Sequence, residues 1–559
     1  MVTTAPAEFP DGVPSEPDFP LGKQPLHEYV AHYAAERPDS VAIDYYGARL
    51  TYGELGDAID RFATELAERG YGRGDTLLLL LQNCPQYVIA YYAAQKLGMR
   101  VSPCSPMAKE HRVSYQLSDG GARIVVAGDT HAPLLEAVRE ESPLEEIVYT
   151  RLETFLPDKP VPAIHEDMAD AIEMPRQPES DDVRYLESIL EETPAEPPAV
   201  EVAMDDICLL QYTSGTTGLP KGCMHSYANV LFAAATSSAL TDRDEHTRHL
   251  AVMPVFHVAG KLNAVDSPMI QGGTTVLLTR YEPEAYVDAL AAHEPTDGWI
   301  TTPMVRELLP LLEAEERSID SLESMPVTSF GQALTEDLCE RWGAVTDSAM
   351  YEASYGLTET HTRDTFTQGL GVIEEGFVGK PVYETDIVIR DWESHEEVPR
   401  GETGEISVKS PSLFEGYLGK PEETEAAFHN GYVLTGDIGR MTDDGALYFL
   451  GRRTYMIKSS GYSIAPAEVE EVLKTHPDVA NAAVAGSDHE TKGSEVVAAV
   501  TTATTADDSF ARDEFLEWAT DRLAPYKRPR DVVVLEGLPV TDMGKLDRER
   551  LEGVIADRA

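Results

Sequence analysis

The sequence predicts an α/β protein with a large N-terminal domain of layered α/β subdomains and a small α+β domain at the C-terminus. Three observations support this prediction. The chain has 559 residues, which is too long for one ordinary hydrophobic core. Short apolar runs alternate with helical patterns along most of the chain, an order that favours parallel sheets covered by helices. After residue 450 the pattern changes to a set of helices and strands large enough for a domain of its own.

The larger domain, residues 27–450, follows a polar and proline-rich lead-in over residues 1–26. Hydrophobic periodicity predicts helices over 54–69, 86–97 and 284–293, and strands over 76–81, 122–127, 274–278 and 298–302. The apolar run at 207–210 indicates the end of another strand. Residues 156–206 are rich in proline, glutamate and aspartate, and such a stretch buries too little apolar surface to pack. We therefore expect a surface excursion there that is partly ordered at best.

The smaller domain spans residues 451–559, and its boundary falls near Gly451-Arg452. Its pattern predicts helices over 466–475 and 511–523, and strands over 479–485, 495–500 and 531–535.

The composition is strongly acidic. The chain has 97 acidic and 45 basic side chains, a formal net charge of −52, and only 14 of the basic residues are lysines. Such a surface stays hydrated in concentrated salt, where screening removes the repulsion between its charges. Because the acidic residues are spread along the whole chain, we interpret the protein as a cytoplasmic protein of a halophile. No basic stripe could displace counterions from a nucleic acid, which excludes that class of partner.

Nothing in the sequence predicts a membrane span or a secretory signal. The longest purely apolar run, Leu77 to Leu81, is far too short to cross a bilayer, and residues 1–20 lack a basic and an apolar region. The five cysteines, at positions 84, 104, 208, 223 and 339, show no metal-site spacing, so we expect free thiols. No feature predicts an oligomeric state.

The most specific motif is Tyr212-Thr-Ser-Gly-Thr-Thr-Gly-Leu-Pro-Lys-Gly222. Its glycines let the backbone approach an anion, its N–H groups and hydroxyls can donate to phosphate oxygens, and Lys221 supplies positive charge. A Walker A loop would need Ser or Thr directly after the lysine, whereas Gly222 stands there. A solvated turn is the alternative, but a motif of this length and order favours a polyphosphate site.

Together with other segments, this loop resembles the adenylate-forming superfamily of acyl-CoA synthetases, peptide-synthetase adenylation domains and firefly luciferases. The resemblance covers most of the chain in the order of the family, and it implies that the C-terminal domain is a mobile lid. The other segments that carry it are Leu50-Thr-Tyr-Gly-Glu-Leu55, Lys96-Leu-Gly98, Pro254-Val-Phe-His-Val-Ala-Gly260, Tyr355-Gly-Leu-Thr-Glu-Thr360, Gly404-Glu-Ile406, Thr435-Gly-Asp437, Gly451-Arg452, Lys458-Ser-Ser-Gly461 and Pro539-Val-Thr-Asp-Met-Gly-Lys545.

The resemblance implies a reaction in two steps. A carboxylate attacks the α-phosphorus of ATP to give an acyl-adenylate and pyrophosphate, and the thiol of coenzyme A then displaces AMP. Positioning and charge neutralisation serve such an attack, so no covalent nucleophile is needed. The implied cofactors are ATP, Mg²⁺ and coenzyme A, and the implied substrate is a small-molecule carboxylic acid. The residues implied to bind the nucleotide are Thr213, Ser214, Gly215, Thr216, Thr217, Gly218, Lys221, Gly331, Gln332, Ala333, Ser354, Tyr355, Gly356, Thr358, Asp437 and Arg452.

Several of these residues have specific implied roles. Tyr355 stacks on adenine, and Ser354 before it replaces a glycine of many relatives, which could crowd the adenine edge. Glu359, with Thr213, provides the hard oxygen ligands that Mg²⁺ prefers. Thr358 contacts phosphate and belongs to the implied catalytic residues.

Other roles concern the ribose, the reacting carboxylate and the acid. Asp437 accepts hydrogen bonds from the ribose hydroxyls, and Arg452 supports the ribose or the phosphate, the alternative being a salt bridge at the hinge. Lys545, on the lid, enters the site and neutralises the charge that develops on the α-phosphate and the carboxylate. His257 borders the acyl pocket, where we expect it to position the acid rather than to transfer protons.

For the second step, Lys458 and Gly461 are implied to lie beside the pantetheine channel. The basic cluster Lys527-Arg528-Pro-Arg530 either meets the phosphates of coenzyme A or balances neighbouring acids. Tyr455 stands at the hinge, where many relatives carry Asp or Lys. A hinge has to absorb a backbone rotation and does not need an acid, so we expect rotation with an altered balance between its two orientations.

The leading hypothesis is an AMP-forming acyl-CoA synthetase for a medium- or long-chain fatty acid, with residues 256–259 and 299–305 lining the acyl tunnel. An aryl acid of the 4-coumarate type is a second hypothesis, and transfer to a carrier protein in trans is a third. A non-catalytic nucleotide-binding relative is the fourth. It is disfavoured because the chain retains Lys221, Glu359, Asp437, Arg452 and Lys545.

Overall fold

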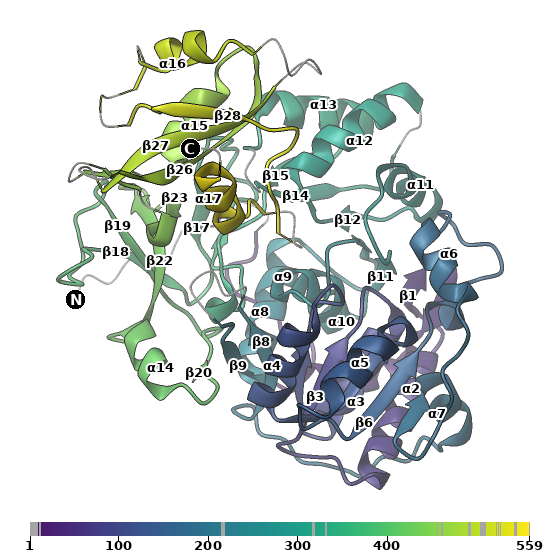
Figure 1. Cartoon of the computed structure of the whole chain (residues 1–559). Coiled ribbons are helices and arrows are strands. Elements are labelled where there is room, and N and C mark those ends of the chain that lie inside the picture. The colour runs from purple at the N-terminus through teal and green to yellow at the C-terminus, as the bar shows by residue number, and fades with distance from the viewer. Residues whose placement is uncertain are drawn as a thin grey trace.

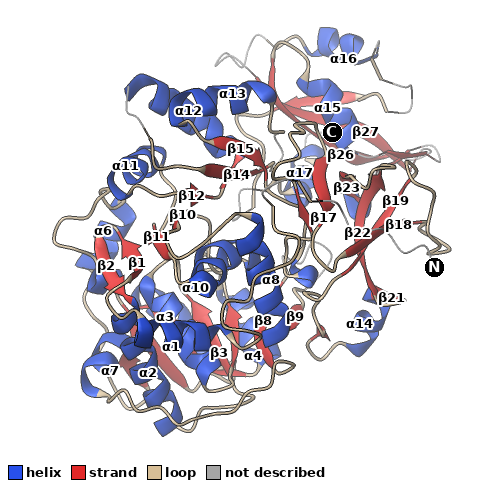
Figure 2. Ribbon diagram, turned by 180° about the vertical axis from the view of Figure 1, so that it is seen from behind, coloured by secondary structure: helices blue, strands red, loops and turns tan. Residues whose placement is uncertain are grey.

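The computed structural model describes residues 9–10, 13–213, 219–315, 319–329, 333–455, 457–459, 462–464, 466–489, 493–502, 510–520, 522–523, 525, 527–541 and 545–557, and all structural statements refer to these residues. Two mostly parallel sheets, one antiparallel sheet and a C-terminal sheet are arranged so that the C-terminal sheet lies at one end of the larger body (Figures 1 and 2).

The first sheet has the strand order β13-β14-β12-β10-β11-β1-β2, with β15 paired to β14. All its pairs are parallel except the hairpin of β1 and β2. Its strands are β1 (Val41–Tyr45), β2 (Ala48–Thr51), β10 (Arg248–Ala251), β11 (Thr274–Leu277), β12 (Asp297–Gly298), β13 (Ile300–Thr301), β14 (Ser324–Thr328) and β15 (Ala349–Glu352).

The second sheet has the order β20-β9-β8-β4-β3-β5-β6-β7. Its strands are β3 (Thr76–Leu80), β4 (Arg100–Pro103), β5 (Ala122–Gly128), β6 (Glu146–Thr150), β7 (Val183–Tyr185), β8 (Ile207–Tyr212), β9 (Gly222–Ser226) and β20 (Gly416–Tyr417). Strand β3 explains the longest apolar run of the sequence. Leu77 and Leu79 face the core that the two sheets share, and Leu78 and Leu80 face a second core, as expected for a parallel strand that is buried on both faces.

Helices cover both sheets (Figure 2). Helix α2 begins with a capping box, because Thr51 Oγ1 accepts from the N–H of Glu54 and the Glu54 carboxylate accepts from the N–H of Thr51. The helices of the larger body are α1 (Leu26–Glu36), α2 (Tyr52–Glu68), α3 (Pro85–Lys96), α4 (Glu110–Gly120), α5 (Ala132–Arg139), α6 (Glu166–Glu173), α7 (Leu186–Glu192), α8 (Tyr227–Leu240), α9 (Val258–Lys261), α10 (Ser267–Gln271), α11 (Pro283–His293), α12 (Thr302–Glu315), α13 (Glu336–Thr346) and α14 (Pro421–Ala427). None of the described helices is both long and apolar enough to cross a bilayer.

The segment over residues 156–206 corrects one expectation, since it contains α6, β7 and α7. Strand β7 extends the edge of the second sheet beyond β6, and Tyr185, Leu186 and Ile189 are buried. A few apolar side chains at strand and helix spacing are therefore enough to fasten a segment that is otherwise acidic. The strand expected over 298–302 is likewise divided into β12 and β13, and Thr302 already begins α12.

The third sheet is antiparallel and has the order β16-β17-β23-β22-β19-β18, with β21 paired to β22. Its strands are β16 (Thr365–Phe366), β17 (Phe377–Pro381), β18 (Asp386–Arg390), β19 (Thr403–Lys409), β21 (Phe428–His429), β22 (Tyr432–Met441) and β23 (Leu447–Arg452). Strand β23 spans the boundary that we place between residues 450 and 451, and the chain leaves this sheet after Arg452.

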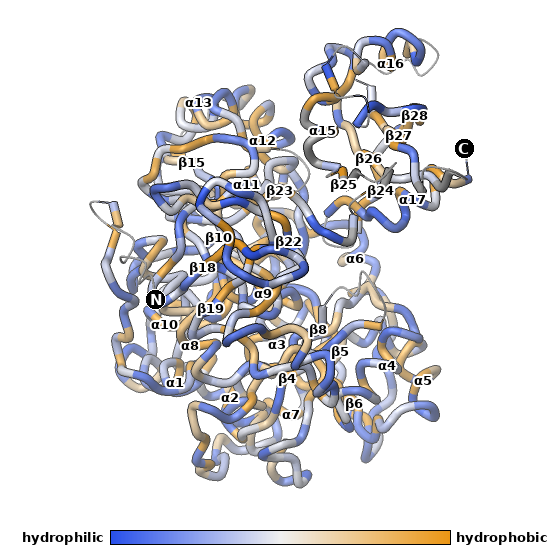
Figure 3. Tube along the Cα trace, turned by 90° about the vertical axis from the view of Figure 1, so that its left-hand side faces the viewer, coloured by the Kyte–Doolittle hydropathy of each residue, from blue (hydrophilic) through white to orange (hydrophobic). Residues whose placement is uncertain are grey.

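The C-terminal unit forms a compact body at one end of the molecule (Figure 3). Its sheet has the order β25-β24-β27-β26, with β28 parallel to β27. Its elements are β24 (Ile457–Ser459), β25 (Tyr462–Ile464), α15 (Pro466–Lys474), β26 (Val479–His489), β27 (Gly493–Thr502), α16 (Arg512–Thr520), β28 (Asp531–Val534) and α17 (Arg548–Ala556). The helices and strands expected here are present, whereas β24, β25 and α17 were not predicted.

Candidate active site

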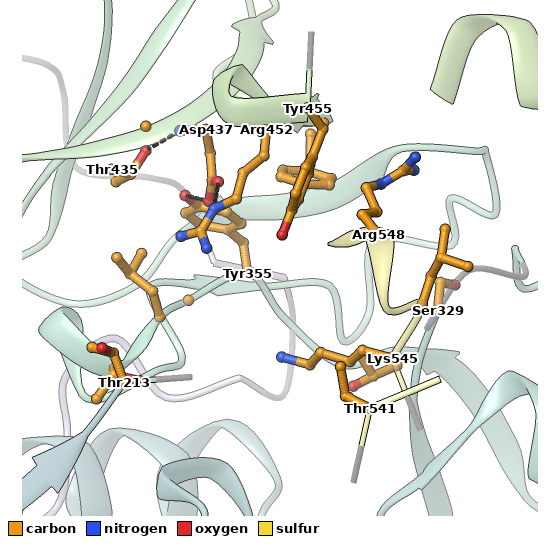
Figure 4. Close-up of a pocket in the computed structure, with 18 of the residues that line it drawn as sticks. Thr213, Ser329, Tyr355, Thr435, Asp437, Arg452, Tyr455, Thr541, Lys545 and Arg548 are labelled. Atoms are coloured by element: carbon orange, nitrogen blue, oxygen red, sulfur yellow. Dashed lines mark hydrogen bonds and ion pairs between the residues drawn. The ribbon is translucent and has the colours of Figure 1, made fainter. Parts of the chain in front are cut away.

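A cleft of about 2320 Å³ is lined by the larger body and the C-terminal unit (Figure 4). The segments that follow β8 and β15 contribute to one side, as expected for the carboxyl ends of strands in an α/β protein. Residues of the antiparallel sheet and of the C-terminal unit complete the walls. The sequence-predicted residues in these walls are Thr213, Lys221, His257, Ala333, Ser354, Tyr355, Gly356, Thr358, Glu359, Asp437, Arg452 and Lys545.

The two ends of the predicted phosphate loop are held together where β8 and β9 pair. The N–H of Thr213 donates to the carbonyl of Lys221 at 3.0 Å, and the N–H of Lys221 donates to Thr213 Oγ1 at 3.2 Å. A Cβ at Gly222 would lie 3.0 Å from the Tyr212 ring, which explains a glycine where a Walker A loop has Ser or Thr. Residues 214–218 of the loop lie outside the described part of the chain.

Tyr417 of β20 connects the predicted phosphate and metal residues. Its hydroxyl donates to Glu359 Oε1 at 2.8 Å, and the Lys221 ammonium lies 4.0 Å from its ring centroid. The carbonyl of Glu359 also accepts from the N–H of Phe414 at 2.8 Å. The carboxylate is thereby held in the cleft wall through one oxygen. Sequence analysis missed Tyr417, and no motif around it signals this contact.

Whether the site fits Mg²⁺ depends on Glu359, the predicted carboxylate ligand. Among the described residues no group of three or more His, Cys, Asp or Glu side chains could hold a metal. Mg²⁺ in nucleotide enzymes commonly needs only one or two carboxylates, because waters and substrate phosphates supply the other ligands. One carboxylate in the cleft wall, which Thr213 and Lys221 also line, therefore fits such an ion.

The backbone at Thr358 is held by a side chain of β9. His225 of β9 donates from Nε2 to the carbonyl of Thr358 at 2.9 Å, and burial lowers the pKa of His225 far below its usual value, so the ring is neutral. Gly356 permits the following turn to pack, since a Cβ there would lie 2.5 Å from the N of Arg363. The cleft wall after β15 consequently depends on glycine at this position.

Asp437 lies at the centre of a hydrogen-bonded group (Figure 4). The Tyr355 hydroxyl donates to Oδ2 at 2.8 Å, Arg452 Nε donates to Oδ1 at 2.7 Å, and the N–H of Asp437 donates to Thr435 Oγ1 at 3.0 Å. Burial raises the pKa of Asp437, and the Arg452 charge opposes that rise. Burial alone would lower the pKa of Arg452. The nearby Asp437 carboxylate has the larger combined effect and raises the pKa of Arg452 above its usual value. A carboxylate has about four lone-pair sites, so Asp437 can accept further hydrogen bonds from a diol.

Lys545 extends from the C-terminal unit into this cleft (Figure 4). The N–H of Thr541 donates to its carbonyl at 2.7 Å, and Val540 and Leu546 form a bridge beside it. The side chain is accessible to water within the cleft. The surrounding protein nevertheless removes part of the hydration of the ammonium group, which lowers the pKa of Lys545. The Arg452 charge lowers this pKa further, and the Asp437 charge raises it. The arrangement brings the implied catalytic lysine to the ribose-side residues Asp437 and Arg452.

His257 caps α9, since its Nδ1 accepts from the N–H of Ala259 at 3.3 Å. Burial, with a smaller effect of the Lys545 charge, lowers the pKa of His257 to about 3. The ring is therefore neutral at physiological pH, which is consistent with positioning rather than proton transfer.

Most of the remaining predicted residues lie outside the described part of the chain. Gly331, Gln332 and Gly461 lie outside the described residues, as does the loop over 214–218, and Lys458 belongs to β24. Arg528 and Arg530 donate to the carbonyls of Leu523 and Pro525 in their own loop. The cleft walls contain several residues that sequence analysis did not assign to the site: Ser329, Glu352, Thr362, Tyr417, Thr435, Thr541 and Arg548.

Comparison with known proteins assigns both parts of the chain to one family. Residues 30–418 match the model of the AMP-binding enzyme, and residues 468–545 match that of the AMP-binding enzyme C-terminal domain. A long-chain-fatty-acid–CoA ligase of Bacillus subtilis is 31% identical over 558 residues, 98% of this chain and 97% of that protein. A 2-succinylbenzoate–CoA ligase of Bacillus licheniformis is 32% identical over 515 residues, with 92% and 97% covered.

Solved structures support the same fold. ATP-bound MatB from Rhodopseudomonas palustris is similar with a TM-score of 0.82 and 24% identity, over 96% of this chain and 100% of that one. The o-succinylbenzoate CoA synthetase MenE from Bacillus subtilis, solved with its acyl-adenylate intermediate, has a TM-score of 0.76 and 28% identity, over 95% and 98%. The chain therefore belongs to the AMP-binding enzyme family, and it is an AMP-forming acid–thiol ligase.

Proposed function

We propose that this chain joins a carboxylic acid to coenzyme A through an acyl-adenylate, using ATP and Mg²⁺. The observation that carries the proposal is the position of Lys545, which lines the same cleft as His257, Asp437 and Arg452 although it belongs to the C-terminal unit. A cation at this place can neutralise the charge that develops between an attacking carboxylate and an α-phosphate.

In the first step, a carboxylate oxygen of the acid bonds to the α-phosphorus of ATP, and pyrophosphate leaves with the bonding electrons. Asp437 holds the ribose, Tyr355 flanks the adenine, and Thr213 and Lys221 contact the phosphates. Glu359 would hold Mg²⁺, which supplies positive charge to the phosphate oxygens. Neutral His257 orients the acid at the mouth of its pocket.

In the second step, the sulfur of coenzyme A bonds to the acyl carbon, AMP leaves, and the thiol proton passes to solvent. Lys458 and Gly461 are our candidates beside the thiol's path, and the C-terminal unit is expected to change its orientation between the steps.

The relatives differ in the acid that they are named for, which includes long-chain fatty acids, 2-succinylbenzoate and, in a feruloyl-CoA synthase of Amycolatopsis that is 30% identical, a feruloyl group. The fatty acid favoured by sequence analysis needs a long apolar tunnel. Trp299 does line a cavity beside His257, but Val305, expected in the same tunnel, is fully buried in the core. This cavity measures about 80 Å³, whereas pockets for drug-sized ligands reach ~300–1,000 Å³. The small volume of this cavity supports a short acid as the substrate.

The test is acid-dependent release of AMP in concentrated KCl with ATP, Mg²⁺ and coenzyme A, across acids from acetate to palmitate plus benzoate and 4-coumarate. Thioester formation that requires coenzyme A supports the proposal. Release of pyrophosphate without a thioester would indicate that the acyl group is transferred to a carrier protein instead of coenzyme A. Absence of both products with every acid would contradict ligase activity.

A substitution tests whether Lys545 acts in the first step. Lys545→Met is expected to slow adenylate formation by roughly 10²- to 10³-fold, as loss of one charge-stabilising group does, while ATP still binds. Lys409→Met is the matched control, because Lys409 lies exposed at the end of β19. We further propose that the enzyme works in the salt-rich cytoplasm of a halophile, as the net charge of −52 suggests.

A further inference from the structure

The cavity beside His257 is the deep continuation of the cleft. His257, Ser354, Thr362 and Lys545 line both spaces, whereas the deeper wall is formed by Asn263, Trp299 and Arg363 among others. An acid whose carboxylate lies at Lys545 therefore extends its other end toward that wall. The chemistry of the wall indicates what the acid carries there.

Arg363 is the unusual residue of this wall. Its exposed fraction is 6%, and its Nε is buried without a hydrogen-bond partner. Within the described part of the chain, its guanidinium forms no hydrogen bond or ion pair. Burial lowers the pKa of Arg363 to about 10, so the side chain remains charged at neutral pH.

The acidic group that acts on Arg363 is already neutralised by other residues. Asp297 accepts from Arg243 Nε at 2.7 Å and pairs with His249 Nδ1 at 2.9 Å, so both of its oxygens are occupied. The Arg243 charge repels Arg363, while Asp297 attracts it. Burying a charge without a counter-ion is strongly unfavourable. The described part of the fold therefore holds a buried cation without giving it a hydrogen-bonded or ion-pair partner.

The backbone that carries Arg363 is strained. His361, Thr362 and Arg363 have φ values of 56°, 59° and 62°, a left-handed run that L-residues other than glycine rarely adopt. Such strain persists only where the surroundings enforce it, and it is concentrated at functional sites. Here the turn packs against Gly356, directly beside the implied nucleotide residues.

We propose that Arg363 is the counter-ion of a second carboxylate on the substrate, so that the acid is a short dicarboxylic acid. The inference rests on the proposed ligase function and names its substrate class. The guanidinium fork matches a carboxylate with two parallel hydrogen bonds. An apolar chain end would leave the charge unpaired, and sites built around a polar partner reject analogues that lack it by factors up to about 10⁴–10⁵.

The test compares length-matched acids with the unmodified protein: succinate with butyrate, glutarate with valerate, and adipate with hexanoate. The readout is kcat/KM for acid-dependent pyrophosphate release. We expect a preference of at least about 100-fold for the diacid of one pair. Equal or better use of the monoacids would overturn the dicarboxylate assignment and leave ligase function intact. Silence with these six acids, while an acid of the wider panel above is used, would also overturn the dicarboxylate assignment. Silence with every acid of both panels would instead contradict the ligase function, and the binding measurement below then decides about Arg363.

Substitution separates substrate recognition from a structural role. Arg363→Met is expected to lower kcat/KM for the diacid by at least about 100-fold and to raise it for the monoacid, with Arg363→Lys between the two. Arg341→Met is the control, because Arg341 lies on the surface in a pair with Glu313. The variants also differ in a measurement without turnover. Unliganded Arg363→Met should unfold at the same or a higher temperature than the unmodified protein, since it removes an unpaired buried charge.

Binding of the acid gives the second readout. At least one of succinate, glutarate and adipate, added with AMP, should raise the unfolding temperature of the unmodified protein and of Arg341→Met, but not of Arg363→Met. A large loss of thermal stability in Arg363→Met would show that Arg363 serves the fold rather than the substrate. Shifts that are equal in all three proteins, or absent with all three diacids, would also overturn the proposal.

Discussion

Asp437 and Arg452 stand directly opposite each other on the paired strands β22 and β23, and Arg452 Nε lies 2.7 Å from Asp437 Oδ1. The pair thus links two strands of the antiparallel sheet at the end of β23, after which the chain continues toward the C-terminal unit. Tyr355, from the segment after β15, donates to the other oxygen of the same carboxylate. Three separate parts of the chain therefore position one candidate ribose ligand.

Asp437→Asn is expected to raise the KM for ATP roughly 10- to 100-fold, because a hydrogen bond to a charged group contributes ~1.5–3 kcal/mol. The KM for the acid should change far less. The measurement is initial-rate kinetics with each substrate varied in turn. Asp444→Asn is the control, since that carboxylate is exposed and pairs with Lys380. Equal effects on both KM values would argue against ribose binding by Asp437.

Tyr455 contacts the C-terminal unit at the expected hinge. The Arg548 guanidinium lies 5.3 Å from the Tyr455 ring centroid, and Arg548 also pairs with Glu470 of α15 at 2.9 Å. Both residues are partly buried, and a cation–π contact that water still reaches contributes ~0.5–1 kcal/mol. Tyr455→Ala should therefore slow adenylate formation about 2- to 5-fold, because this orientation of the unit loses a contact.

Comparison of the two half-reactions distinguishes the loss of this contact from a general loss of activity. Thioester formation from preformed acyl-adenylate should not slow in Tyr455→Ala, and Tyr455→Phe, which retains the ring, should match the unmodified protein. Equal slowing of both half-reactions would show that the contact does not select one orientation.

Local patterns predicted much of the fold because they record local physics. The helix expected over 54–69 is α2, which begins two residues earlier because of the Thr51 and Glu54 capping box, and the Leu77–Leu81 run forms a strand buried on both faces. The antiparallel third sheet escaped prediction, since its strands lack the strand–helix alternation that identifies the other two.

The contacts that complete the candidate site depend on tertiary packing. Tyr417 and Glu359 are 58 positions apart in sequence, and nothing near Tyr417 indicates the carboxylate that it meets. Arg363 lies three residues after the motif that ends at Thr360, but a single arginine in sequence is usually a solvated surface charge. Its importance depends on burial and on the prior pairing of Asp297, which only the structure reveals.

Salt dependence tests the interpretation of the composition. With a net charge of −52, repulsion between acidic groups should dominate at low ionic strength and be screened in molar KCl, where the Debye length falls to ~3 Å. We expect the unfolding temperature to rise steadily from 0.1 to 3 M KCl. Sucrose at equal osmolality stabilises by exclusion without screening, and it should raise the temperature less. A constant or falling unfolding temperature in KCl would contradict the halophilic interpretation.

Glu352, the last residue of β15, should make stability depend on pH. The N–H of Ser329 donates to its Oε1 at 3.0 Å and the Ser329 hydroxyl to its Oε2 at 2.5 Å. Burial nevertheless raises the pKa of Glu352 from 4.5 to about 7, against the smaller effect of these hydrogen bonds. The folded protein therefore keeps a proton that the unfolded chain has lost between about pH 4.5 and 7, and its free energy of unfolding falls as pH rises through that window.

Glu352→Gln cannot ionise and should lack this loss. At 1.36 kcal/mol per pKa unit, the free energy of unfolding of Glu352→Gln relative to the unmodified protein should increase by an amount on the order of 3 kcal/mol between pH 5 and 8. Urea titrations at fixed high KCl measure the difference while the surface charges remain screened. Glu313→Gln is the control, because the surface partner Arg341 lowers the pKa of Glu313, so that carboxylate is ionised across the whole range. A difference that does not change with pH would mean that Glu352 is already charged in the fold, and the Ser329 hydrogen bonds would then outweigh its burial.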